Sequence, residues 1–306
     1  MSELTLVTAF FNIGRESFNV IPRSDSTYVD YFRRWARIRN RLVVYTFKGM
    51  DDIVRKIRVE YGLLEKTKII VLDDIFQIEP NIIEEMEKLS KGYWFRRFRF
   101  YPNAVSNNPY YSYLMLLKNW FMKDAADRGL LTDMSVWIDF GFDHGGALYT
   151  NPEDWDFEWK YNFSDNIHLF YHEELDEKPI FEIVHRLCDS IMGCIYVVPS
   201  HYCDELWKLT KEAMEDLLSV GLYDDDQPLL LMAYRSKSEI FKMHKSDWFL
   251  PVKEYGGEHM HIKKQYVTKK TLKKQLVSYY TKYKQIAAHI YKLYSDLKKD
   301  IVPNRL

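Results

Sequence analysis

Residues 134–148 read MSVWIDFGFDHGGAL, and no other stretch of the chain says as much about the fold. An apolar, strand-like run ends at Asp139, and a glycine-rich turn with Asp143 and His144 follows at once. Such an arrangement often holds a divalent metal ion against a phosphate, because carboxylate oxygens are hard ligands and glycine lets the backbone approach closely. Asp139 and Asp143 are therefore candidate metal ligands, with His144 beside them. The plain alternative is a strand end followed by a polar turn.

Upstream of this stretch, apolar runs rich in β-branched residues alternate with amphipathic segments. The runs cover residues 4–11, 42–47, 68–72 and 134–140, and the amphipathic segments cover 25–38, 50–60, 80–90 and 108–128. This alternation predicts an α/β fold with a mostly parallel sheet. Ligands of such sheets bind at the carboxyl ends of the strands. The polar side chains expected there are Asn12 with Arg15, Thr46 with Lys48, Asp73 with Asp74, and Asp139.

The second half of the chain is less regular. Residues 151–166 are rich in Trp, Asp and Asn and predict a loop, and strands are expected at 167–171 and 193–198. Helices are expected over 200–220 and from the acidic run at 224–226. Residues 268–298 are rich in Lys and Tyr with helical apolar spacing. We expect one domain over residues 1–265 and a helical C-terminal extension over 266–306.

Composition indicates a globular protein and restricts its partners. Hydrophobic residues make up 47% of the 306 residues, and the formal net charge of −1 gives no case for nucleic acid. The chain has three cysteines without disulfide or zinc spacing, and it has no membrane-length apolar run. We therefore expect a soluble cytoplasmic protein. Basic stretches at 95–101 and 263–284 would suit peripheral contact with anionic lipid at the inner face of a membrane, and a solvated face or contact with a phosphorylated acceptor fits them equally well.

Three further groups of residues could carry chemistry. Asp225 and Asp226, with Asp224 before them, could supply a general base or bind a sugar hydroxyl, although acidic residues at a helix start also serve as caps. His259 and His261 follow paired glycines and could bind a metal ion, although such histidines are more often structural or exposed. Lys118 could meet a diphosphate, or could lie on a solvated helix face.

Several well-known motifs are absent from the sequence. It contains neither GxGxxG nor GxxxxGK[ST], so a dinucleotide-binding fingerprint and a P-loop have no support. It also lacks the GxSxG nucleophile elbow of α/β-hydrolases.

Four segments of the chain, taken together, resemble a known family. They are residues 8–15 (TAFFNIGR), 31–36 (YFRRWA), 43–46 (VVYT) and 137–141 (WIDFG). In this order they resemble the HtrL/YibB family of bacterial surface-glycan and lipopolysaccharide-core loci, and more broadly a glycosyltransferase of the GT-A type. The resemblance covers most of residues 4–250 and implies a GT-A-like, Rossmann-type mixed sheet flanked by helices.

The resemblance also implies roles for individual residues. Residues 1–150 would form a nucleotide-binding half and 151–265 an acceptor half. Asp139 would occupy the metal-motif position, where this chain departs from Asp-x-Asp because residue 141 is glycine; Asp143, His259 or His261 would then complete the ligand set. Asp226, or Asp225, would be the base of an inverting reaction. The donor-binding residues would be Thr8, Ala9, Phe10, Arg15, Tyr45, Thr46, Asp73, Lys118, Asp139 and Gly193.

The function predicted on these grounds is a hexosyl- or pentosyltransferase. It would move a sugar from a nucleoside-diphosphate donor, UDP-linked in the first instance, to a hydroxyl of a surface glycan or lipopolysaccharide-type acceptor. Mn²⁺ or Mg²⁺ would neutralise the departing diphosphate. Two alternatives stay open: a non-catalytic glycan- or nucleotide-binding protein on the same fold, and a nucleotidyltransferase. Donor hydrolysis separates the first alternative from an enzyme, and release of pyrophosphate identifies the second.

Overall fold

The computed structural model describes residues 3–18, 22–99, 106–172, 175, 177–187 and 190–263, together with seven residues between 283 and 294. The predicted C-terminal extension therefore lies almost wholly outside the described residues. One seven-stranded sheet organises the chain, in the order β3-β2-β1-β4-β6-β5-β7. The strands are β1 Leu4–Phe10, β2 Arg41–Thr46, β3 Thr67–Val71, β4 Met134–Ile138, β5 Ile167–Tyr171, β6 Ile191–Pro199 and β7 Phe241–Lys245.

The sheet is mixed, because one of its strands runs against the others. β1 pairs in parallel with β2 and β4, β2 with β3, and β5 with β7, whereas β6 is antiparallel to both β4 and β5. The predicted α/β class with a mixed sheet and flanking helices is thus confirmed. β7 was not predicted from the sequence: it lies at the sheet edge and buries only Phe241, so it shows little apolar alternation.

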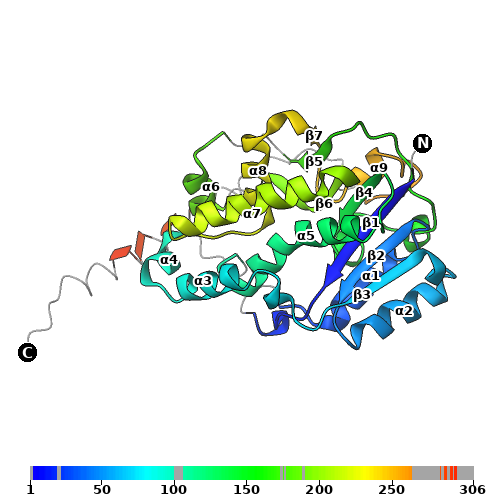
Figure 1. The fold of residues 1–306 in the computed structure, drawn as a ribbon, viewed down its shortest axis with the longest axis horizontal. Coiled ribbons are helices and arrows are strands. Elements are labelled where there is room, and N and C mark those ends of the chain that lie inside the picture. Colours follow the sequence, from blue (N-terminus) through cyan, green and yellow to red (C-terminus); the bar gives the residue numbers. More distant parts are fainter. Residues whose placement is uncertain are drawn as a thin grey trace, which may run out of the picture.

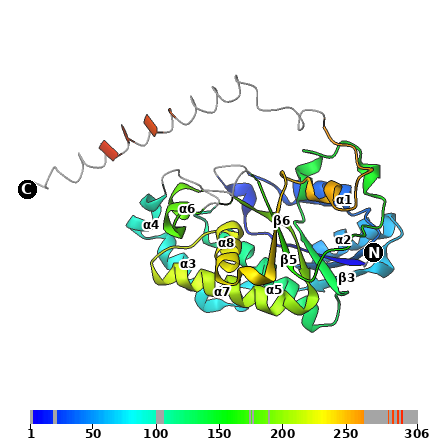
Figure 2. The ribbon, with the colours of Figure 1, turned by 90° about the horizontal axis from the view of Figure 1, so that it is seen from above.

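Helices cover both faces of the sheet (Figures 1 and 2). One apolar core joins the sheet to α3, α5, α7 and α8, and a second joins the opposite face to α1 and α2. Strand alternation divides the side chains between them: Val7 belongs to the first core and its neighbour Leu6 to the second. The helices are α1 Asp25–Trp35, α2 Met50–Glu60, α3 Pro80–Ser90, α4 Tyr93–Phe98, α5 Pro109–Asp127, α6 Ile180–Arg186, α7 Cys203–Ser219, α8 Asp226–Ser236 and α9 Pro251–Glu254.

Capping side chains begin the three helices that border the candidate site. Ser24 accepts a hydrogen bond from the backbone N–H of residue 27 at the start of α1, and Asn108 and Asp225 make the equivalent contacts at α5 and α8. Each cap satisfies a backbone donor that the helix itself leaves free. Among the described residues, no helix is long and apolar enough to cross a membrane.

The order of the strands decides where a ligand can bind. The chain runs outward from β1 through β2 to β3, and then returns to the other side of β1 for β4. The loops that leave β1 and β4 therefore diverge from adjacent strands and leave a crevice between them. β2 and β3 lie to one side of this crevice.

Candidate functional site

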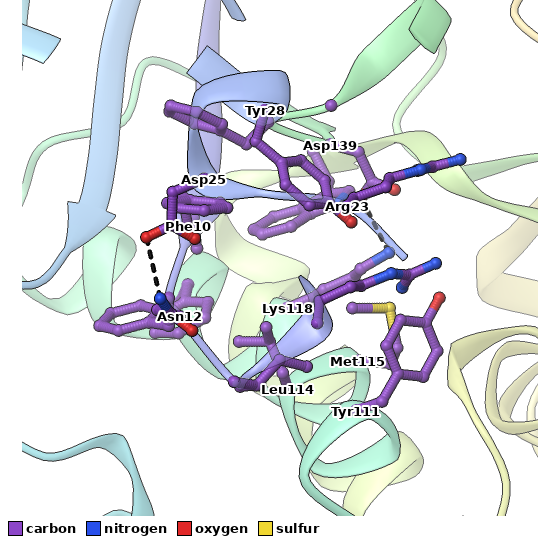
Figure 3. A pocket seen from close by; sticks show the side chains of 18 of the residues that line it. Phe10, Asn12, Arg23, Asp25, Tyr28, Tyr111, Leu114, Met115, Lys118 and Asp139 are labelled. Carbon is purple, nitrogen blue, oxygen red and sulfur yellow. Dashed lines mark hydrogen bonds and ion pairs between the residues drawn. The ribbon is translucent and has the colours of Figure 1, made fainter. Parts of the chain in front are cut away.

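A cavity of about 230 Å³ lies at the carboxyl ends of β1 and β4 (Figure 3). We call it the cleft. Its walls come from the residues after β1, the start of α1, one side of α5, and the turn after β4. The lining residues that bear on the argument are Ala9, Phe10, Asn12, Arg15, Arg23, Asp25, Tyr28, Tyr111, Lys118, Trp137, Asp139, Phe140, Gly141 and His144.

A buried lysine between two aspartates forms one side of the cleft. The Lys118 ammonium lies 2.8 Å from Asp139 Oδ1 and 2.5 Å from Asp226 Oδ2, and it donates to the carbonyl of Gly193 at 3.0 Å. These three acceptors use all three of its N–H bonds. Only 4% of the lysine side chain is exposed, against 32% for Asp139. We call these three charged residues the Lys118 cluster; Lys118 and Asp139 both line the cleft, and Asp139 is the more exposed of the two.

Burial and mutual charge set the protonation of the cluster. Burial lowers the pKa of Lys118, but the charges of Asp139 and Asp226 outweigh it and hold that pKa well above 10.5. Burial also raises the pKa of Asp226, against the opposing effect of the Lys118 charge. Asp139 Oδ1 accepts a second hydrogen bond from the Trp137 indole at 2.8 Å. Its Oδ2 accepts none from the described residues, so it can accept one from a ligand.

Gly193 on β6 makes room for the cluster. A Cβ atom there would lie 2.0 Å from Asp226 Oδ2 and 2.3 Å from its Cγ, so any side chain would displace the carboxylate from Lys118. Gly193, which the resemblance implied as a donor-binding residue, therefore leaves space for the Asp226 carboxylate and offers its carbonyl to Lys118.

Two arginines bring positive charge to the cleft. Neither Arg15 nor Arg23 forms an ion pair with a carboxylate in the part of the chain that the structure describes. The Arg15 guanidinium lies 4.9 Å from the ring centroid of Tyr111, and the Arg23 guanidinium lies 5.8 Å from those of Tyr28 and Tyr31. Sequence reasoning missed Arg23, since it precedes the α1 cap and does not follow a strand.

Aromatic rings and one histidine complete the walls. The ring of Phe10 lies 5.1 Å from that of Tyr28 and 4.9 Å from that of Phe140. Burial, reinforced by the positive charges of Arg23 and Arg15, lowers the pKa of His144 to about 4. The imidazole is therefore neutral at pH 7. Sequence reasoning also missed Tyr28 and Tyr111, which come from helices on opposite faces of the sheet.

The four predicted metal ligands do not come together. Asp143 is buried and its carboxylate accepts backbone N–H groups of Leu148 and Tyr149, so it closes the turn after β4; burial raises its pKa to about 6. His259 and His261 bind the 151–156 loop instead, through the carbonyl and the carboxylate of Asp154. Within the described residues, no group of three or more His, Cys, Asp or Glu could hold a metal ion.

Position 141, where the sequence departs from Asp-x-Asp, has little room for a side chain. A Cβ atom on Gly141 would lie 3.0 Å from the Tyr28 ring. Asp139 is then the single carboxylate of this motif, and the Lys118 ammonium already lies on one of its oxygens. A divalent cation needs several oxygen ligands and is repelled by an adjacent ammonium. The residues present therefore fit an ammonium at this position and do not fit a divalent metal ion.

The remaining predicted donor-binding residues lie away from the cleft lining. Thr8 is buried within β1, and the Thr46 hydroxyl donates to the Phe10 carbonyl. Tyr45 is buried against α5, with its hydroxyl on Asp124 at 2.8 Å. Asp73 is exposed after β3, to one side of the crevice.

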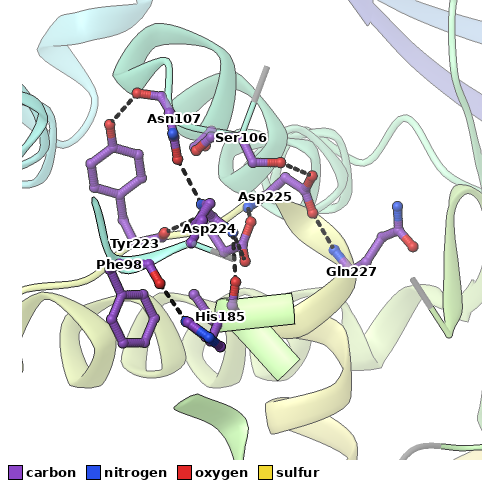
Figure 4. A network of polar contacts seen from close by, with 11 residues as sticks. Phe98, Ser106, Asn107, His185, Tyr223, Asp224, Asp225 and Gln227 are labelled. Atoms are coloured by element: carbon purple, nitrogen blue, oxygen red, sulfur yellow. Dashed lines mark hydrogen bonds and ion pairs between the residues drawn. The ribbon is translucent and has the colours of Figure 1, made fainter. Parts of the chain in front are cut away.

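The acidic run divides into three separate roles. Asp224 pairs with buried Arg99 at 2.9 Å, and Asp226 pairs with Lys118. Asp225 lies between them; its carboxylate accepts from the Gln227 backbone N–H and the Ser106 hydroxyl, as Figure 4 shows. Neither Asp225 nor Asp226 lines the cleft. The capping alternative predicted for this run is therefore the observed role of Asp225.

Comparisons with known proteins agree on a family. A family model described as "Bacterial protein of unknown function (HtrL_YibB)" matches residues 2–255. Protein HtrL of Escherichia coli (strain K12) is 28% identical over 267 residues, which cover 81% of this chain and 90% of that protein. The crystal structure of mouse xyloside xylosyltransferase 1, apo form, is similar over 78% of this chain and 84% of its own, with 11% identity and a TM-score of 0.41. Similarity at that level transfers no residue and no activity to this chain.

Proposed function

The chain belongs to the HtrL_YibB family, and from that premise we propose that it transfers a sugar from a nucleoside-diphosphate sugar to a hydroxyl group of a glycan acceptor. One observation carries the proposal. At the β1–β4 crevice, the guanidinium groups of Arg15 and Arg23 line the same cleft as the carboxylate of Asp139. Such a cleft combines charge for a diphosphate with an acceptor for a sugar or ribose hydroxyl. The resemblance of the four sequence segments to GT-A-type glycosyltransferases supports it.

In this proposal each group meets a different part of the donor. Arg15 and Arg23 bind the diphosphate, because the planar guanidinium offers paired donors that match phosphate oxygens. Asp139 Oδ2 accepts a hydrogen bond from a ribose or sugar hydroxyl. The rings of Phe10 and Tyr28 present an apolar surface to the base or to a sugar face.

The reaction breaks the bond between the anomeric carbon and the diphosphate oxygen. The electron pair of that bond goes to the diphosphate, where the two guanidinium groups stabilise the developing charge. The acceptor hydroxyl oxygen bonds to the anomeric carbon. Its proton passes to the departing diphosphate, because Asp225 and Asp226 are engaged in other contacts and lie outside the cleft lining. This route retains the anomeric configuration. The predicted alternative, with Asp226 or Asp225 as base, inverts it.

The test is a donor panel in two stages. The purified protein is incubated with nucleoside-diphosphate sugars, first alone and then with oligosaccharide and lipopolysaccharide-core acceptors, and the released nucleotide is identified. Release of a nucleoside diphosphate, reduced by about 10- to 100-fold in Arg23→Met but not in the half-exposed control Arg33→Met, is the expected result. Release of pyrophosphate would indicate a nucleotidyltransferase. Donor binding without any release, with or without acceptor, would indicate a binding protein. Proton NMR of the product gives the anomeric outcome.

A further inference from the structure

We propose that the cleft binds the diphosphate of its donor without a divalent metal ion, because the protein's own cations occupy the positions at which a metal would act. The inference deepens the proposed function and rests on it for the identity of the ligand. It runs against the sequence prediction of Mn²⁺ or Mg²⁺, and it rests on three features of the cleft.

The first feature is the Lys118 ammonium between two carboxylates. Asp139 and Asp226 each place an oxygen within 2.8 Å of the same nitrogen, so together they outline a cation position that Lys118 fills. The Gly193 carbonyl supplies a third oxygen ligand at 3.0 Å. Two carboxylates and a carbonyl are the oxygen donors that a divalent cation prefers. Here the cation is covalently part of α5, and it cannot be removed by a chelator.

The second feature is that the part of the chain described by the structure brings no further free carboxylate to the position of a metal. Gly141 carries no carboxylate and the Tyr28 ring leaves little room for one, and the Asp143 carboxylate accepts hydrogen bonds from backbone N–H groups. Asp25 is the other carboxylate that lines the cleft, and it accepts a hydrogen bond from the Asn12 amide at 2.9 Å. The described residues therefore do not assemble a ligand set for a metal that bridges the protein and a diphosphate.

The third feature is the pair of arginines. Arg15 and Arg23 are both near enough to His144 for their charges to lower its pKa, and among the described residues they contact aromatic rings and form no ion pair with a carboxylate. Their positive charge is thus held in place without being neutralised. This is the electrostatic role that a metal plays toward a departing diphosphate.

The experiment measures binding, so it does not depend on turnover. Affinities for inorganic pyrophosphate, UDP, GDP, ADP and CDP are measured by calorimetry in EDTA and in Mn²⁺. We expect at least one nucleotide to bind with a dissociation constant that changes less than about 3-fold between the two buffers, and Arg15→Met or Arg23→Met to weaken it about 10- to 100-fold. The matched control is Arg33→Met, which replaces a half-exposed arginine of α1 that pairs with Glu60.

A second measurement tests the cation position directly. Electron paramagnetic resonance of Mn²⁺ should show no binding to the wild-type protein. Lys118→Ala leaves Asp139 and Asp226 without their cation, and it should gain a Mn²⁺ site with a dissociation constant of about 0.1–1 mM, the range of weak oxygen-ligand sites. Lys123→Ala, which removes a partly exposed lysine of the same helix that pairs with Asp127, should gain none. Where Lys118→Ala does not fold, the wild-type binding data decide.

The outcomes separate the inference from the proposed function. Mn²⁺ binding by the wild type that Asp139→Asn abolishes, or nucleotide binding that requires Mn²⁺, would overturn the inference and leave sugar transfer possible. The absence of binding by all five probes in both buffers would also overturn it. Metal-independent binding with no sugar transfer to any acceptor would keep the inference and reject the proposed function.

Discussion

Two buried cations pair with aspartates near the start of α8: Arg99 with Asp224, and Lys118 with Asp226. The two clusters differ in the number of carboxylates that face the cation. In the first, Arg99 pairs with Asp224 alone, and its other donors go to the Val184 and Tyr223 carbonyls and the Asn107 side chain. In the second, Lys118 faces two carboxylates, and one of them opens onto the cleft.

The difference separates a structural role from a functional one. The Arg99 pair is electrically balanced and enclosed, so it ties together the segments around residues 107, 184 and 223–224. The Lys118 cluster carries a surplus negative charge and keeps Asp139 partly exposed, an arrangement that stability alone does not require. The Arg99 pair should therefore matter most for folding, and the Lys118 cluster for ligand binding.

The largest expected effect is on the Arg99 pair. Arg99→Met leaves Asp224 buried without its cation and orphans two carbonyls, so the free energy of unfolding should fall by about 3–5 kcal/mol. Urea denaturation measures the change, with exposed Arg96→Met on the same segment as the control. Lys118→Met should lower the free energy of unfolding less than Arg99→Met does, since the surplus carboxylate of the Lys118 cluster can take up a proton. A smaller loss in Arg99→Met than in Lys118→Met would reverse the assignment of roles.

Neutralising the two aspartates sharpens the comparison. Asp224→Asn leaves the Arg99 charge unpaired and should cost about 2–4 kcal/mol of unfolding free energy. Asp226→Asn keeps the shape and leaves Lys118 paired with Asp139, so the cost should be below about 1 kcal/mol. The same denaturation experiment compares the two. Equal losses would show that the second carboxylate of the Lys118 cluster is structural.

The sequence predicted the positions of the strands better than it predicted which side chains meet. Apolar runs located β1 to β4, and an aspartate at the end of β4 and a lysine on the preceding helix were both candidates. Neither the meeting of Lys118 with Asp226 nor the approach of Arg23 could be predicted, because both depend on the packing of helices distant in sequence. Tyr45 shows a further limit. The side chains of a strand that is buried on both faces do not reveal which of them point toward the cleft, and Tyr45 points toward α5 and Asp124.

A medium effect is expected at Gly193. Gly193→Ala places a methyl group where the Asp226 carboxylate lies, so unfolding free energy should fall by about 1–3 kcal/mol and nucleotide affinity should fall with it. The added Asp226→Ala substitution removes the clash. In the double variant, the loss of stability caused by Gly193→Ala should therefore shrink. Additive losses in this double-mutant cycle would contradict the close approach.

The smallest expected effect is a difference in pH dependence between the two clusters. The carboxylates hold the pKa of Lys118 well above 10.5 in the folded protein, whereas it is about 10.4 in the unfolded chain. The stability that this proton contributes is therefore complete below about pH 10 and is lost as the pH rises toward the folded pKa. Arg99 keeps its charge throughout this range.

Unfolding free energies at about pH 8 and about pH 11 test this contrast. The gap between the wild type and Lys118→Met should narrow at the higher pH, because the unfolded wild-type chain then releases the Lys118 proton while the folded state keeps it, which stabilises the unfolded state of the wild type but not that of the variant. The gap between the wild type and Arg99→Met should stay constant, since the guanidinium does not titrate. Because surface tyrosines and surface lysines far from the two clusters titrate equally in all three proteins, their contributions cancel in each gap. A Lys118 gap that is the same at both pH values would mean that the ammonium is not held between two charged carboxylates, and the distinction between the two clusters would fail.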